Sequence, residues 1–192
     1  MQLTWRETLL AALALMFVGC AETQRLMARY PEAEAFVTRA ATAYGQQPPS
    51  MHVSATGNGW VAYVQDGVIH LDMDTLGFAD WRLKKVLAHE YAHILLNNFR
   101  NGGTPALENE TDAKGVEVLM KADNLSEREA FDIFYRYAGG WRVLKGELPV
   151  VRDAKGHGSL CERIDYLLVR YPVQATWAKP CGYKPATAEV QP

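Results

Sequence analysis

Hydrophobic residues recur at helical spacing in the middle of the chain, from residue 79 to residue 98. The apolar positions of this stretch are Leu83, Val86, Leu87, Ala88, Ile94, Leu95 and Leu96. Steps of three and four residues keep side chains on one face of an α-helix, whereas a half-buried strand would alternate apolar and polar residues. The pattern predicts one long helix, with Asp80 as its N-cap and a stop at Asn97 and Asn98, before Gly102-Gly103.

Further helices are expected before and after this one. Thr104 and Pro105 form a cap followed by a proline at the first helical position. Ser126 and Ser159 each precede a glutamate by three residues, which is the capping-box pattern at a helix start. The predicted helices span residues 31–44, 106–120, 126–137 and 160–170.

Residues 58–71 alternate apolar and polar positions, which is the period of a strand. The alternation is interrupted by Asp66-Gly67, a dipeptide typical of the two-residue turn of a β-hairpin. We therefore expect an α+β fold, in which a small antiparallel sheet made of this hairpin packs on the 79–98 helix.

The long helix carries the run His89-Glu90-Tyr91-Ala92-His93, which matches H-E-x-x-H. Two histidines four residues apart lie on one face of a helix, so both rings can bind one metal ion. Glu90 points about a quarter-turn away, where it can act on a metal-bound water as a general base. The pattern predicts a zinc (Zn²⁺) site in a hydrolase, and the alternative is a set of polar residues that bind no metal.

A third metal ligand is expected on the 106–120 helix. Glu108 completes a His-His-Glu set, and Asp112, one turn later, is placed to accept a hydrogen bond from a ring N–H of His89. Glu110 and Glu117 are rival ligands. Glu110 lies on the opposite side of the helix from Glu108, and only Glu108 has an acidic residue four positions later, so Glu108 is preferred.

H-E-x-x-H followed by Glu108-x-x-x-Asp112 resembles the pattern of the gluzincins, and the surroundings look most like the HtpX-type zinc metallopeptidases. The hairpin over 58–71 and the stretch from Val86 to His93 are similar to elements of that family. So is His157-Gly158 through Arg163-Ile164, although Gly158 stands where the family usually has proline. The segment from Glu108 to Met120 also resembles a helix of the ImmA-like peptidases.

This resemblance implies a zincin-like peptidase domain that holds one zinc ion and cleaves polypeptides. In that family a strand at the edge of the hairpin pairs with an extended substrate. By the same resemblance, His157 approaches the zinc, either to stabilise the oxyanion or to occupy the open position. In the mechanism that we expect, Tyr91 is a second candidate to stabilise the oxyanion. Arg163 is expected to tether its helix to Asp112 or Glu108. The alternatives are an exposed loop histidine and a surface arginine.

The N-terminus resembles a bacterial lipoprotein signal. Residues 9–18 form an apolar run too short to span a bilayer, and Phe17-Val18-Gly19-Cys20 is similar to a lipobox. This resemblance implies removal of residues 1–19, lipidation of Cys20 and a place in the cell envelope facing the periplasm, with the outer membrane favoured. An ordinary cleaved signal peptide is the alternative.

With Cys20 lipidated, Cys161 and Cys181 remain as a pair in an oxidising compartment, which predicts a disulfide between them. The chain is then divided into a signal peptide at 1–19, a lipidated segment with an opening helix at 20–50, a peptidase domain at 51–172 and a C-terminal tail at 173–192. The stretch from Lys184 is expected to be disordered.

The net charge is −2, from 20 Lys and Arg against 22 Asp and Glu, and both signs are dispersed. This excludes the basic surface of a nucleic-acid-binding protein. The expected partners are a polypeptide substrate, such as an unfolded envelope protein, and the membrane through the lipid. The expected function is zinc-dependent endoproteolysis. Two alternatives are a non-cleaving, chaperone-like lipoprotein on the same fold and a structural lipoprotein without metal.

Overall fold

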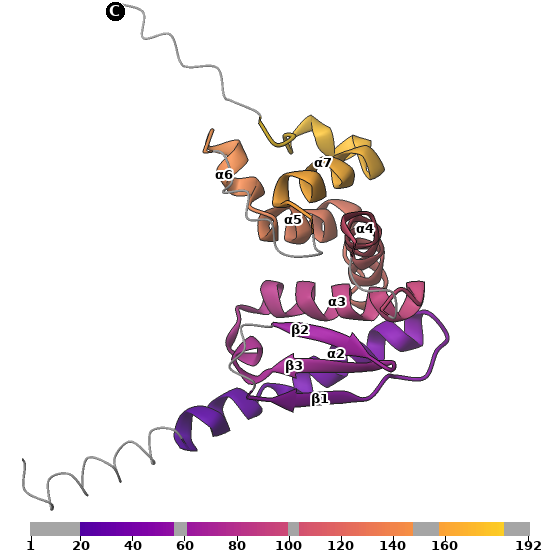
Figure 1. Cartoon of the computed structure of the whole chain (residues 1–192), viewed down its shortest axis with the longest axis vertical. Helices are drawn as coiled ribbons and strands as arrows, with labels where there is room; N and C mark the ends of the chain where they lie inside the picture. The colour runs from indigo at the N-terminus through magenta and orange to yellow at the C-terminus, as the bar shows by residue number, and fades with distance from the viewer. Residues whose placement is uncertain (1–19, 56–60, 100–103, 148–157, 183–192) are drawn as a thin grey trace, which may run out of the picture.

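The structure, a computed structural model, describes residues 20–55, 61–99, 104–147 and 158–182. Figure 1 shows two halves, one with the sheet and helix α2 (Tyr30–Ala43), the other purely helical. Helix α3 (Asp80–Leu96) runs between them, beside the sheet on one side and the helices α4 (Pro105–Ala122) and α5 (Glu127–Tyr137) on the other. The fold is therefore mixed α+β, as expected.

The sheet has three strands, β1 (Met51–Ser54), β2 (Ala62–Gln65) and β3 (Val68–Asp72), in the order β1-β3-β2. Strands β2 and β3 form the predicted hairpin, and Asp66 and Gly67 in its turn have φ angles of 51° and 77°. Positive φ at both central residues is what a type I′ turn requires.

Strand β1 pairs with β3 in parallel, so the prediction of a purely antiparallel sheet was wrong. The four residues of β1 are too short to show a convincing alternation. The chain passes from β1 to β2 on the other side of β3 and returns through the hairpin, so β3 lies in the centre and runs parallel to β1. One face of β3 is consequently buried through Ile69 and Leu71, and β2 forms one edge of the sheet.

The predicted helices agree with α2, α3, α4, α5 and α7 (Leu160–Arg170). Both capping boxes and the Thr104 cap are present. The prediction of Asp80 as an N-cap was wrong, because Ala79 holds that position without a side-chain cap and the Asp80 carboxylate pairs with Arg29 at 2.5 Å. Not predicted were the helical residues 20–27, the short helix α6 (Gly140–Leu144) and the 3₁₀ segments η1 (Met73–Gly77) and η2 (Pro172–Thr176).

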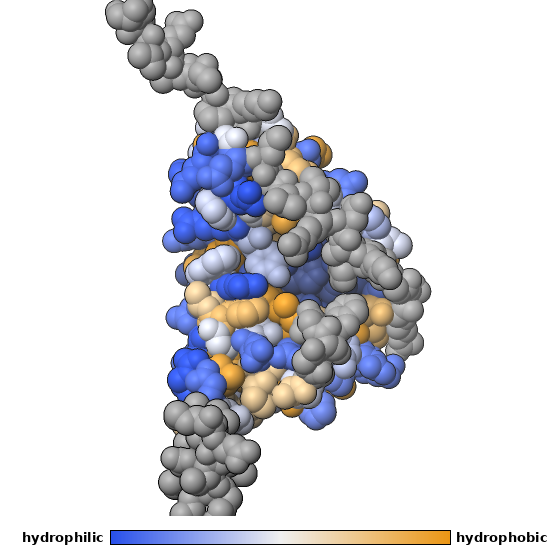
Figure 2. Space-filling model, turned by 60° about the vertical axis from the view of Figure 1, so that its left-hand side comes forward, coloured by the Kyte–Doolittle hydropathy of each residue, from blue (hydrophilic) through white to orange (hydrophobic). Residues whose placement is uncertain are grey.

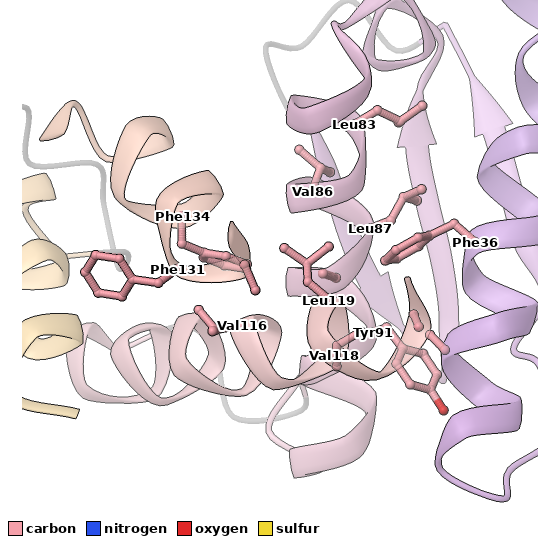
Figure 3. Packing of buried hydrophobic residues seen from close by; sticks show 14 of the residues in the cluster. Phe36, Leu83, Val86, Leu87, Tyr91, Val116, Val118, Leu119, Phe131 and Phe134 are labelled. Atoms are coloured by element: carbon pink, nitrogen blue, oxygen red, sulfur yellow. The ribbon is translucent and has the colours of Figure 1, made fainter. Parts of the chain in front are cut away.

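A continuous hydrophobic core joins the two halves (Figure 3). Phe36 of α2 packs toward Leu87 of α3, while Leu119 of α4 lies between α3 and Phe134 of α5. The opening helix α2 therefore shares its core with the segment expected to form the peptidase domain.

The chain after α7 folds back onto α5. The predicted disulfide between Cys161 and Cys181 is present. Ala178 is fully buried, and the Tyr135 hydroxyl exchanges two hydrogen bonds of 3.0 Å with the backbone of Lys179. The signal peptide expected over residues 1–19 and the tail from Lys184 lie outside the described residues. Within the described residues, no helix has the length and apolar character needed to cross a membrane.

Candidate metal centre

Helices α3 and α4 bring His89, His93 and Glu108 together at the boundary between the two halves. The ligand atoms that the three residues offer all lie within 4.8 Å of one another. The Nε2 atoms of His89 and His93 are 3.2 and 3.6 Å from the two carboxylate oxygens of Glu108, and the imidazole rings are perpendicular with centroids 4.8 Å apart. Among the described residues, this is the only such group of three.

Asp112 fixes the orientation of the His89 ring. Its Oδ1 lies 2.8 Å from His89 Nδ1, as predicted from the four-residue spacing to Glu108. Arg163 of α7 donates two hydrogen bonds to the same carboxylate, at 2.5 and 2.6 Å, which confirms the expected tether and selects Asp112 as its partner. A buried carboxylate that already accepts from a guanidinium is charged, so His89 Nδ1 must carry a proton and donate it to Asp112.

Lys85 is a third partner of Asp112 that the sequence analysis did not identify. It lies one turn before His89, is buried, and places its Nζ 3.4 Å from Asp112 Oδ1 and 4.1 Å from the centre of the Tyr137 ring. Burial alone would raise the pKa of Asp112. The charges of Arg163 and then Lys85, with the hydrogen bond from His89, outweigh this effect and hold that pKa well below its usual value.

Asn98 orients the ring of His93, as Asp112 orients that of His89. The sequence predicted Asn98 only as part of a helix stop. Asn97 ends α3 in the left-handed region, with φ of 50°, and Asn98 Oδ1 lies 2.7 Å from His93 Nδ1. The Asn98 amide nitrogen donates to the Thr111 hydroxyl at 3.0 Å, which assigns the oxygen to the histidine side. The two asparagines directly after the H-E-x-x-H helix are the sequence signal that could have indicated this contact.

With Nδ1 held by an oxygen, both histidines turn Nε2 toward Glu108. Burial, followed by the charge of His89, lowers the pKa of His93 to about 4, so His93 is neutral at pH 7. Two imidazole nitrogens and a carboxylate, all groups that can donate an electron pair to a metal, thus face one another within 4.8 Å. Two nitrogen donors and one oxygen donor fit zinc, with the second ring nitrogen of each histidine held by an oxygen.

The rival acidic residues lie elsewhere. Glu110 is exposed, whereas Glu108 is only 1% exposed. Glu117 pairs with Lys114 at 2.7 Å and with Arg170 at 3.5 Å, so its carboxylate belongs to a surface network. The structure therefore favours Glu108 over both rivals.

The suggestion that Tyr91 stabilises an oxyanion was wrong. Its side chain is completely buried in the core, and Figure 3 shows the ring pointing toward α2. Its hydroxyl donates to Gln46 Oε1 at 3.0 Å. Tyr91 is two positions after His89, so the helical turn directs it to the opposite side. His157 lies outside the described residues. Glu90, which directly follows His89 in the chain, has a buried side chain.

The chain enters α7 through Gly158, whose φ is +68°. A proline cannot adopt this angle, so Gly158 could not be replaced by proline without changing the backbone here. A Cβ at Gly158 would lie 3.0 Å from Pro105 Cβ, so this entry packs closely against the start of α4. The close approach brings Arg163 within reach of Asp112.

Figure 2 shows hydrophilic residues in a recess between the half with the sheet and the helical half.

No protein-family model matches this chain, and no curated protein or solved structure is detectably similar to it.

Proposed function

We propose that this protein is a zinc-dependent endopeptidase with a zincin-like fold. The observation that carries the proposal is the convergence of His89 Nε2, His93 Nε2 and the buried Glu108 carboxylate, whose ligand atoms all lie within 4.8 Å of one another. The hydrogen bonds from each Nδ1 to Asp112 and Asn98 support it, because they orient both rings for one ion.

His89, His93 and Glu108 would hold the zinc ion. A zinc ion held there would supply a coordinated water with a pKa of about 7 and a Lewis acid for the substrate carbonyl group. Glu90 accepts the proton of the attacking water and then delivers it to the leaving amine. Burial of Glu90 keeps this exchange away from bulk water. Arg163 and Lys85 keep Asp112 charged, so His89 remains fixed throughout the cycle.

The edge strand β2, which lies beside α3, favours a polypeptide as the substrate. An extended chain that pairs with the open side of β2 would run along the helix that carries His89 and His93, as in β-augmentation. We further propose that the protein is anchored in the bacterial envelope through lipid on Cys20, which is exposed at the start of the helical residues 20–27.

The test replaces Glu90 by glutamine in the purified protein, with Glu110→Gln as a matched control because Glu110 is an exposed glutamate of the adjacent helix. Metal analysis is expected to find about one zinc per chain in all three proteins, as a three-ligand site implies. Cleavage of an unfolded polypeptide should be lost only in Glu90→Gln. Equal zinc but no cleavage by any of the proteins would instead support a non-cleaving binding protein, and absence of zinc would overturn the site.

A further inference from the structure

A groove with a volume of about 660 Å³ runs along the outer side of α5. Trp81 at the start of α3, Trp141 and Leu144 of α6, and Trp177 after η2 form its walls, at the end of the molecule where α6 lies in Figure 1. Residues of α5 form its floor. None of the lining residues belongs to the candidate metal centre.

Two of the three wall tryptophans are open to solvent. Trp141 is 48% exposed and Trp81 is 40% exposed, and Leu144 beside them is 40% exposed. Half-exposed indole rings keep a large apolar face available for contact. Exposed apolar surface that gathers in one concave place marks a binding site more often than scattered single residues do.

The floor is polar, but its charges are already balanced. Asp132 pairs with Arg136 at 2.6 Å, and the Arg128 guanidinium lies over the Trp177 ring, 5.1 Å from its centre. Glu129 caps the first turn of its own helix. Two positive and two negative groups therefore line the groove, which favours a ligand without net charge. Paired guanidinium and carboxylate groups still donate to and accept from hydroxyl groups.

A proline-rich peptide is the other ligand that aromatic grooves commonly bind. The carbonyl groups of such a peptide have no partners within their own helix and need donors from the protein. Two polar aromatic groups in this groove are already engaged. The Trp177 indole N–H donates to Gln174 at 2.9 Å, and the Tyr135 hydroxyl is engaged with the backbone of Lys179. A polyproline chain also has no N–H to donate to the carboxylates of Glu129 and Asp132, whereas hydroxyl groups both donate and accept, so the groove favours a ligand rich in hydroxyl groups.

We propose that this groove binds a neutral oligosaccharide. The apolar faces of its sugar rings stack on Trp81 and Trp141, and its hydroxyl groups bond to the carboxylate and guanidinium groups of α5. The volume lies within the range of about 300–1,000 Å³ that small-molecule sites occupy. The site is independent of the metal centre and of proteolysis.

The experiment measures binding of chitotetraose and cellotetraose, two neutral β-linked sugars, by tryptophan fluorescence and calorimetry. Saturable binding of at least one sugar is expected. Trp141→Ala and Trp81→Ala should each weaken it about tenfold, which corresponds to ~1.4 kcal/mol. Trp141→Phe should retain part of the affinity. Tyr166→Ala, a partly buried aromatic residue of α7 outside the groove, is the matched control and should bind normally.

The affinity for the sugar should be the same with and without zinc, and the same in Glu90→Gln. This result would show that the groove is separate from the proposed peptidase site. The proposal is overturned if neither sugar binds. It is also overturned if the tryptophan variants, shown to be folded by circular dichroism, bind as well as the control. Binding of a ten-residue polyproline peptide in place of the sugars would assign the groove to a peptide and equally reject the proposal.

Discussion

Replacing Arg163 with methionine tests whether the charge of Asp112 depends on its partner from α7. Methionine retains an apolar stem but removes the guanidinium that bonds to Asp112 at 2.5 and 2.6 Å. Both side chains are more than nine-tenths buried, so water does not replace the lost contacts. Asp112 would keep Lys85 at 3.4 Å and His89 at 2.8 Å.

Breaking a buried ion pair on one side typically destabilises a protein by ~3–5 kcal/mol, because the other charge stays buried. Lys85 remains beside Asp112 and compensates part of that charge, so we expect the low end, about 3 kcal/mol in the free energy of unfolding. This equals a loss of more than about a hundredfold in the folding equilibrium constant.

Guanidinium unfolding of the metal-free protein at pH 7, with the disulfide intact, measures this change. Arg170→Met is the matched control, because Arg170 lies on the same helix but is largely exposed. Its ion pair with Glu117, at 3.5 Å, is a surface pair. A surface pair contributes about 0–1 kcal/mol. A double-mutant cycle with Asp112→Asn should show coupling, because the neutral amide no longer needs the guanidinium.

Two results would refute this reasoning. One is a loss of stability in Arg163→Met no larger than in Arg170→Met. The other is strict additivity in the cycle with Asp112→Asn, which would mean that Arg163 stabilises the fold through packing alone.

Three further predictions concern the metal centre and the core. Asn98→Ala should lower zinc affinity about 10–100-fold, because the His93 ring loses its orienting acceptor, whereas Asn98→Asp should lose less; competition with a chelator measures both. The pKa of His93 is lowered to about 4, so between pH 6.5 and 4 the unfolded chain binds a proton that the folded protein does not. Stability of the metal-free protein should therefore fall by about 3 kcal/mol as the pH drops through this window, and unfolding curves of His93→Gln should show a smaller fall. Gly115→Ala should destabilise by about 1–3 kcal/mol, because its Cβ would lie 2.4 Å from the ring of Phe134; an unchanged unfolding midpoint would contradict this packing.

The candidate ligand pair His89 and His93 was predictable from the sequence because it depends on the repeat of one helix, whereas Glu108 reaches the pair only through the packing of α4 on α3. His89 and His93 share a face through the repeat of one helix, and the same repeat places Asp112 one turn after Glu108. The hairpin turn at Asp66-Gly67 is equally local, since its conformation depends on two residues that tolerate positive φ.

Tertiary structure alone decided which distant groups complete the centre. Lys85 reads as an ordinary helix residue until α3, α4 and α5 pack and enclose its ammonium group beside Asp112. The sequence left Arg163 two possible partners, and only the packing of α7 on α4 selected one. Strand β1 joined the sheet in parallel, and three tryptophans from separate segments came to line one groove, for the same reason. Such contacts depend on which helices and strands pack against one another. The periodicity of residues within a single helix or strand does not contain this information.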